Sequence, residues 1–207
     1  MRKYLGQIIF LLALMISAPA YAHHAMGGRL PSRFDEGLFS GLAHPIINLQ
    51  HFSFVVAVGV LAAAAQGSRL LPVWFVFGTA AGCLVMSQMA PLPQSAVFVP
   101  ASLLVIGAAL IWKRRLAPLV VVTAFLVGGL LHGSAYAEAI VGGDGDSLLG
   151  YLLGFTVIQS AIAISVTTLS YRIWSGDQLY TSARLAGGIV LGIGLGTLAG
   201  QSGLLFA

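Results

Sequence analysis

Long apolar blocks separated by short polar loops make up most of the chain. The blocks cover residues 39–65, 71–90, 94–112, 116–138, 148–173 and 182–205. Each block has the roughly 20 residues that an α-helix needs to cross the hydrocarbon core of a bilayer. The pattern therefore predicts an all-α membrane protein in which residues 39–207 form a bundle of six transmembrane helices.

The first 22 residues have the pattern of a secretory signal peptide. Arg2 and Lys3 precede a short apolar stretch, and Ala20-Tyr21-Ala22 matches a small-x-small cleavage site. An uncleaved first membrane helix is the alternative, but the apolar run is short for a span. We expect residues 1–22 to be removed and the polar residues 23–38 to form an extracytoplasmic tail that contains histidine.

Composition agrees with a membrane protein and excludes several other classes. Hydrophobic residues make up 58% of the chain and charged residues only 8%, with a mean hydropathy of +0.94 and a net charge of +4. About a quarter of the residues are charged in a typical soluble domain. So few charges exclude a cytosolic enzyme, a disordered protein and a nucleic-acid-binding domain.

Basic residues in the loops predict the orientation in the membrane. The loops after the first, third and fifth blocks carry Arg69, then residues 113–115, then Arg172 and Arg184. The intervening loops contain no Lys or Arg and carry acidic residues instead. Because Lys and Arg are enriched in cytoplasmic loops, the mature N-terminus and the C-terminus are both predicted to be extracytoplasmic.

Glycine recurs at intervals of four in two of the predicted spans. Small residues on one helix face let a neighbouring backbone approach closely. In the last span this face is predicted to pack either within the monomer or against a second subunit or membrane partner. The glycines are Gly129 and Gly133 in the fourth block and Gly188, Gly192, Gly196 and Gly200 in the last.

A polar stripe lies within the first apolar block. Ionisable and amide side chains are costly in a bilayer and generally face the protein interior. His44, Asn48 and His51 are spaced to share one helix face. Gln50 lies beside this stripe, and Pro45 removes a backbone hydrogen bond and predicts a local break.

A second polar group ends the fourth block. His132 and Tyr136 share a helix face, and Glu138 follows them. Gln88 in the second block and Gln159 in the fifth are further amide side chains at membrane depth. Hydrogen bonding that only stabilises helix packing is the alternative role for all such polar groups.

Imidazole and carboxylate groups together suit nickel, cobalt, zinc or iron. We expect one transition-metal site in the outer half of the bundle, with breaks near Pro45 and Gly133 exposing backbone groups to a cavity. The predicted ligands are His44, His51, His132 and Glu138, supported by Asn48, Gln50, Gln88, Tyr136 and Gln159.

At these residues the chain resembles the HupE/UreJ family of small bacterial membrane proteins over essentially its whole length. That family typically has HPxxGxDH in its first span and an HGxAHGxE-like motif later. The matching positions are His44, Pro45 and His51, then His132, Gly133, Ala135 and Glu138. The resemblance implies a nickel or cobalt permease of the bacterial plasma membrane, a secondary transporter whose metal ion is substrate rather than cofactor.

Several positions depart from the family motifs, namely Asn48, Gln50, Tyr136 and Ala137. Gln50 stands where the family has an acidic residue, and a divalent cation in a medium of low dielectric needs compensating charge. Glu138 is then the one carboxylate within the motifs. The second hypothesis is therefore a non-transporting accessory protein that assists metalloenzyme assembly or stabilises a membrane complex.

Enzymatic activity is not expected, because no nucleophile beside a base is recognisable in the sequence. His23 and His24 follow the predicted cleavage site directly. A free α-amino group and adjacent imidazoles can chelate a metal near neutral pH. We expect either an external capture site at these residues or a flexible tail with two incidental histidines.

Overall fold

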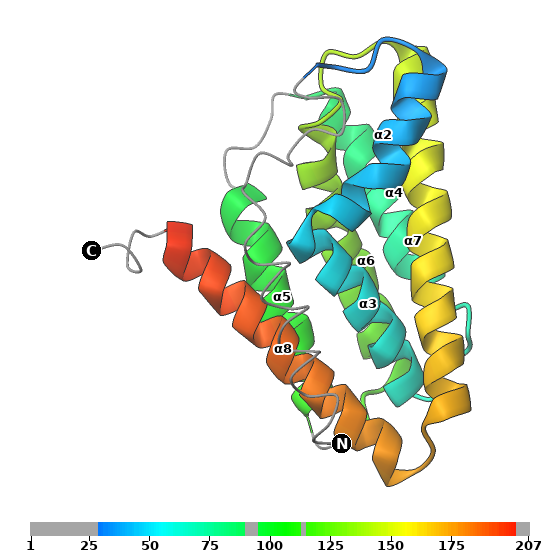
Figure 1. The fold of residues 1–207 in the computed structure, drawn as a ribbon, viewed down its shortest axis with the longest axis vertical. Coiled ribbons are helices and arrows are strands. Elements are labelled where there is room, and N and C mark those ends of the chain that lie inside the picture. The colour runs from blue at the N-terminus through cyan, green and yellow to red at the C-terminus, as the bar shows by residue number, and fades with distance from the viewer. Residues whose placement is uncertain (1–28, 90–94, 113–114, 202–207) are drawn as a thin grey trace, which may run out of the picture.

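The structure is a computed structural model that describes residues 29–89, 95–112 and 115–201. The predicted signal peptide and the His23–His24 pair lie outside the described residues. Within the described ranges the chain is helical and contains no strand (Figure 1). The helices are α2 (Phe34–Ile47), α3 (Leu49–Ala64), α4 (Val73–Ser87), α5 (Ser95–Ile111), α6 (Pro118–Ala137), α7 (Gly145–Ile173) and α8 (Asp177–Gln201).

Each apolar block forms helix, but the first block is divided. Helices α2 and α3 meet at Asn48 with a bend of 78°. The break predicted near Pro45 is present and lies at Asn48, so the prediction that His44, Asn48 and His51 share one helix face is wrong. The first helix also begins at Phe34, within the segment predicted to be a tail.

The membrane-spanning character of the bundle rests on its longer helices. Helices α6, α7 and α8 are long and apolar enough to cross a bilayer, and α2 with α3 adds a fourth span if the bent pair counts as one. Helices α4 and α5 have 15 and 17 residues, about 23 and 26 Å against a hydrocarbon core of about 30 Å. The all-helical fold is confirmed, whereas the count of six spans stays a prediction.

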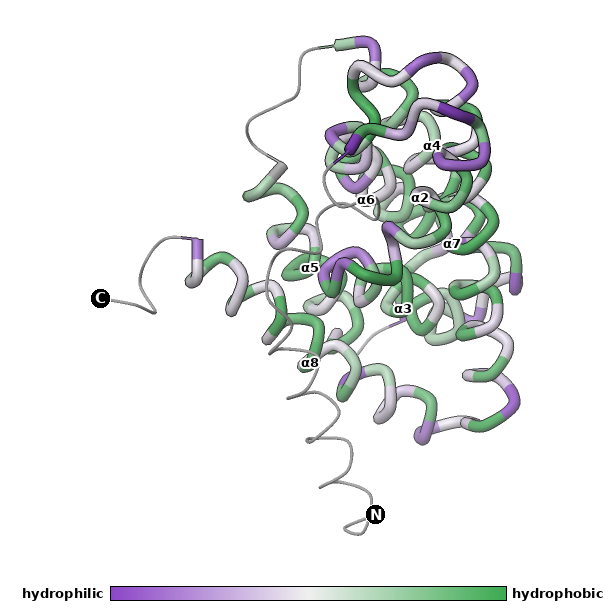
Figure 2. The backbone as a smooth tube through the Cα atoms, turned by 45° about the horizontal axis from the view of Figure 1, so that its top comes forward, coloured by the Kyte–Doolittle hydropathy of each residue, from purple (hydrophilic) through white to green (hydrophobic). Residues whose placement is uncertain are grey.

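The outer faces of the long helices carry large apolar side chains. Leu119 of α6 is 76% exposed, Leu149 of α7 52% and Leu185 of α8 70%. Figure 2 shows hydrophobic residues along the helices and hydrophilic ones concentrated near their ends and connections. Such an extensive exposed apolar surface is unfavourable in water and suits lipid.

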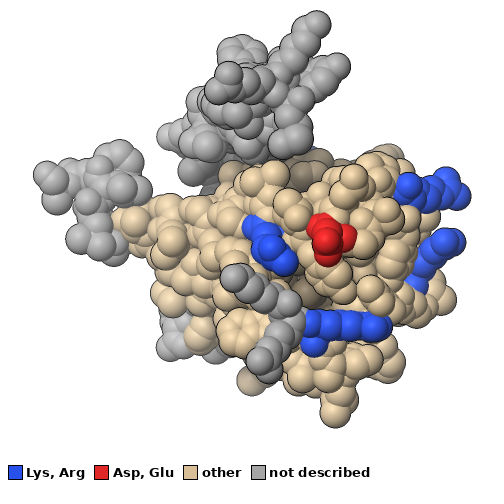
Figure 3. Space-filling model, turned by 90° about the horizontal axis from the view of Figure 1, so that it is seen from below, with Lys and Arg blue, Asp and Glu red and all other residues tan. Residues whose placement is uncertain are grey.

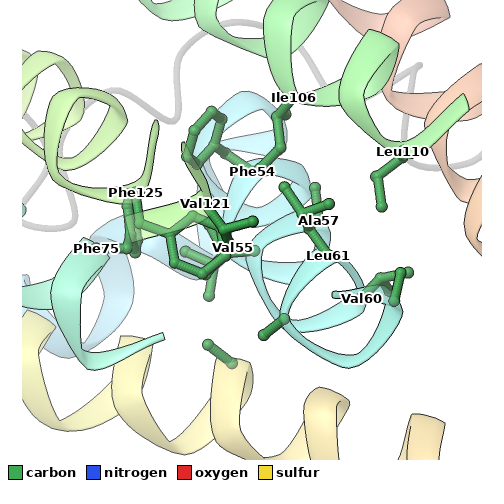
Figure 4. Close-up of a cluster of buried hydrophobic side chains, with 14 of the residues drawn as sticks. Phe54, Val55, Ala57, Val60, Leu61, Phe75, Ile106, Leu110, Val121 and Phe125 are labelled. Carbon is green, nitrogen blue, oxygen red and sulfur yellow. The ribbon is translucent and has the colours of Figure 1, made fainter. Parts of the chain in front are cut away.

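Helix α3 runs through the centre of the bundle, between α7 and the α5–α8 pair (Figure 1). It is apolar on nearly all sides, as expected of a helix that is buried all round. Val55, Ala57 and Val58 are fully buried. Figure 4 shows Phe54 of α3 near Phe75 of α4, and the two rings lie 5.3 Å apart. The middle of α3 is thus held inside the protein.

Facing glycines bring four of the other helices together in two close pairs, α2 with α7 and α4 with α6. A Cβ atom on Gly133 would overlap the carbonyl oxygen of Thr79, and one on Gly154 that of Leu38. Helix α6 continues through Gly133, so the predicted break there is wrong, and this glycine instead permits close backbone approach. The same role belongs to Gly37, Gly41, Gly78, Gly82, Gly129 and Gly150.

The predicted glycine face of α8 points away from the described part of the bundle. A Cβ atom at any of its members would meet no described atom within 4 Å, whereas Gly187 and Gly194 are the glycines that pack against α5. Packing of this face against the described helices is therefore excluded. Contact with a second subunit or a membrane partner stays a prediction for Gly188, Gly192, Gly196 and Gly200.

The basic residues in and beside three of the helix connections lie at one end of the bundle. Arg69 lies in the α3–α4 connection, Arg115 just before α6 and Arg172 in the last turn of α7. Figure 3 shows basic side chains spaced around an acidic group on this face. The opposite end carries Glu138 and Asp144 after α6, and Arg33, which is paired with Asp35 at the start of α2. An excess of Lys and Arg in the connections on one side is the pattern that sets the orientation of multi-pass proteins.

Candidate metal site

A pocket of about 440 Å³ lies beside the break between α2 and α3. Helix α5 begins there, and α6 and α8 end there, so the pocket lies at the end of the bundle opposite Arg69 and Arg172. Its lining is polar around the break and includes exposed residues at the rim. The lining residues are His44, Asn48, Gln50, His51, Ala96, Val99, Ala135, Glu138, Ala139 and Gln201.

Asn48 creates the break that shapes this pocket. Its backbone is extended, with φ −90° and ψ 112°, and its side-chain Oδ1 accepts hydrogen bonds from the backbone N–H groups of Gln50 and His51 at 3.0 and 3.2 Å. Asn is among the residues preferred at such an N-cap. Pro45, three residues earlier, has no N–H to continue the ladder of α2. The chain therefore ends one helix and starts another within a single residue.

The break makes neighbours of two histidines that a straight helix would separate. The ring centroids of His44 and His51 lie 5.3 Å apart. Seven residues along a continuous helix would place the two Cα atoms about 10.5 Å apart along its axis. Both side chains line the pocket, although each is less than 10% exposed.

Tyr136 of α6 packs against both of these imidazole rings. Its ring centroid lies 4.5 Å from that of His44 and 4.5 Å from that of His51. Gln159 of α7 donates from Nε2 to the Tyr136 hydroxyl at 2.9 Å, and both residues are fully buried. Gln159 Oε1 accepts no hydrogen bond from the described residues. Tyr136 and Gln159 thus support the histidines from behind and do not line the pocket.

His132 is fully buried next to His51 and likewise does not line the pocket. Its Nδ1 lies 2.8 Å from Nδ1 of His51, and its Nε2 lies 2.9 Å from Oγ of Ser102 on α5. The ring also packs on Phe54, with centroids 4.2 Å apart. The structure therefore brings the three predicted histidines together, with His132 as the inner member.

Ser102 is the contact that sequence reasoning missed. It is one of two serines in an otherwise strongly apolar block. A lone serine in a membrane helix commonly bonds to the carbonyl of the preceding turn. The sequence therefore indicates only that Ser102 places a hydroxyl group within a membrane helix, at about the depth of the histidines.

Glu138 and Gln50 reach the pocket, and Gln88 does not. Glu138 is exposed just beyond the end of α6, and Gln50 is half-buried in the first turn of α3. Gln88 is exposed at the end of α4 and bonds to Ser87 at 3.4 Å. Among the described residues, no group of three His, Cys, Asp or Glu side chains is close enough to hold one metal ion. A complete ligand set at the pocket therefore requires side-chain movement.

The family model described as "HupE / UreJ protein" matches residues 11–197. This range contains helices α2 to α7, most of α8, and every residue of the two histidine motifs. No curated protein and no solved structure matches the chain significantly. Because one family model covers most of the chain, including both motifs that line or support the pocket, the protein belongs to the HupE/UreJ family.

Proposed function

We propose that this protein is a secondary permease for nickel or cobalt and that the ion enters through the pocket at the α2–α3 break. The observation that carries the proposal is the lining itself, in which His44, His51 and Glu138 all take part. Two imidazoles and a carboxylate form a donor set suited to these metals. Membership of the HupE/UreJ family supports the same function.

The pocket has a modest charge for a divalent ion. Glu138 is its one carboxylate, and Gln50 lines it where the family motif has an acidic residue. A cation in low dielectric needs compensating charge, so we expect weaker binding than in relatives with the full motif. Glu138 is exposed, and in this proposal its carboxylate turns toward the imidazoles when the ion binds.

The proposed direction of ion entry follows from the basic residues in the connections at one end of the bundle. If the arginine-bearing connections are cytoplasmic, the pocket opens toward the outside of the plasma membrane. The chain then has extracytoplasmic termini, and in this proposal His23 and His24 act as an extracytoplasmic capture site. No P-loop occurs in the sequence, so a gradient or a partner supplies the energy.

A non-transporting accessory role is the second candidate, and two observations favour it. No three ligand-type side chains among the described residues converge on a single point, and Gln50 and Tyr136 replace residues that bind metal readily. In that role the protein would assist metalloenzyme assembly or stabilise a membrane complex, with the open glycine face of α8 as the contact surface.

Uptake by proteoliposomes distinguishes the two candidates. Purified protein is reconstituted around a metal-sensitive dye, and nickel, cobalt and zinc are added outside. We expect faster entry of nickel and cobalt than into empty liposomes, and loss of that entry in the His44→Ala/His51→Ala variant. Gln88→Ala, which lies outside the pocket, is the control and keeps the full rate. Entry no faster than into empty liposomes would reject the permease and favour the accessory role.

A further inference from the structure

Three hydrogen bonds in series connect helices α5, α6 and α3 behind the pocket. Ser102 Oγ lies 2.6 Å from the carbonyl oxygen of Val99 and 2.9 Å from His132 Nε2. His132 Nδ1 in turn lies 2.8 Å from His51 Nδ1. The side chains are buried, with Ser102 6%, His51 4% and His132 0% exposed, so bulk water competes little for these bonds.

The first contact sets the direction of the series. A carbonyl oxygen has no proton, so two oxygens 2.6 Å apart must share the hydroxyl proton of Ser102. The Ser102 oxygen is then an acceptor toward His132, which donates from Nε2–H. A neutral imidazole carries one N–H, so His132 Nδ1 is an acceptor and His51 donates to it from Nδ1–H.

This order leaves the lone pair of neutral His51 on Nε2. We propose that Ser102 is a positioning residue that acts through His132 to make Nε2 the metal-binding nitrogen of His51. That an ion binds to His51 rests on the proposed function, whereas the positions of the protons on His51 and His132 do not depend on a metal. Metal-binding histidines generally donate their second N–H to an oxygen acceptor, and here a second imidazole takes that place.

The reversed order shows what Ser102 contributes. If Ser102 donated to His132 Nε2, His132 would donate from Nδ1 to His51, and the proton of His51 would move to Nε2. Ser102 would then lose its bond to Val99, and the nitrogen offered to the ion would carry a proton. Loss of a partner behind a metal-binding histidine typically costs 10–100-fold in metal affinity, which is the loss expected for Ser102→Ala.

Nitrogen NMR of histidine tests the proposal directly. Protein labelled with ¹⁵N-histidine is studied in lipid nanodiscs without metal, and the signals are assigned with His→Gln variants. Protonated and unprotonated ring nitrogens have distinct shifts, so we expect Nδ1–H for His51 and Nε2–H for His132. Ser102→Ala should shift both residues toward a mixture of forms, and Ser102→Thr, which keeps the hydroxyl, should restore the wild-type pattern.

Ser134→Ala is the matched control. Ser134 of α6 makes the same kind of bond, from Oγ to the carbonyl oxygen of Leu131 at 2.7 Å, and no hydrogen bond joins it to a histidine among the described residues. Its removal should leave both histidine patterns unchanged. Wild-type protein with the proton of His51 on Nε2 would overturn the proposal, even if Ser102→Ala failed to fold.

Nickel titration of the same proteins separates this inference from the proposed function. We expect Ser102→Ala to bind 10–100-fold more weakly than wild type, with Ser102→Thr and Ser134→Ala close to wild type. Unchanged histidine patterns in folded Ser102→Ala would reject the positioning role even if wild type binds nickel. If the histidine patterns are as expected but the wild-type protein does not bind nickel, the metal site is rejected while the assigned order of protons is retained.

Discussion

The imidazole rings of His44 and His51 lie 5.3 Å apart although they belong to different helices. Their proximity depends on the bend of 78° between α2 and α3 and on Tyr136, which contacts both rings. Two polar side chains thus meet at a break that lines a pocket, one of the settings in which irregular backbone is tolerated at membrane depth.

Asn48→Ala removes the cap that starts α3. Its Oδ1 accepts from two backbone N–H groups, and loss of such a cap costs about 1 kcal/mol of stability. We expect a lower melting temperature in detergent and weaker nickel binding, because His51 loses its fixed orientation. Asn48→Asp keeps the acceptor and should melt close to wild type. Equal stability of Asn48→Ala and wild type would show that the break does not depend on this cap.

Gln50→Asp adds a carboxylate to the pocket lining. Opposite unit charges at 4 Å attract by about 4 kcal/mol at an effective dielectric constant of 20, and desolvation of the new carboxylate offsets part of this. We expect nickel affinity to rise about tenfold, equivalent to about 1.4 kcal/mol. Gln88→Asp adds the same charge outside the pocket and should leave affinity unchanged. An equal gain from both variants would mean that only net charge matters.

Tyr136→Phe leaves a buried amide without its acceptor. Gln159 Nε2 donates to the Tyr136 hydroxyl at 2.9 Å, and an unsatisfied buried donor costs about 1–3 kcal/mol. We expect Tyr136→Phe to destabilise the protein by about that amount. Because Tyr136→Phe/Gln159→Leu removes both partners, the double variant should recover part of the loss in a denaturation experiment. Failure to recover any stability would argue against this hydrogen bond.

Gly133→Ala should destabilise the protein, whereas Gly196→Ala should not. A methyl group at Gly133 meets the carbonyl oxygen of Thr79, whereas one at Gly196 meets no described atom within 4 Å. We expect Gly133→Ala to lower the melting temperature, since α4 and α6 must move apart, and Gly196→Ala to leave the stability of the monomer unchanged. Similar melting of the two variants would contradict the observed packing of α4 on α6.

The helical segments were predictable because apolar blocks of near-membrane length leave the backbone few alternatives. The bend was only half predictable. Pro45 signals a break, but Asn48 sets its position three residues later by capping α3. Residues on either side of a cap no longer follow helical periodicity, so the expected stripe through His44 and His51 failed although the two side chains meet.

Glycine and serine were harder to interpret from the sequence. Gly133 suits either a break or a close helix contact, and only the position of α4 shows that it serves the contact. Ser102 gives no pattern of its own, because its role depends on a histidine 30 residues away. Contacts between helices that are distant in sequence set both roles, and local periodicity does not report such contacts.

Nickel titration of purified protein by equilibrium dialysis tests the central claim, that the pocket at the α2–α3 break is the metal site. His23 and His24 are replaced by Ala throughout, so that a site in the tail does not contribute. On this background we predict one bound ion per chain for the protein with an intact pocket and for Gln88→Ala, and none for His44→Ala/His51→Ala at the same concentrations. Undiminished binding by the folded double variant would contradict the account.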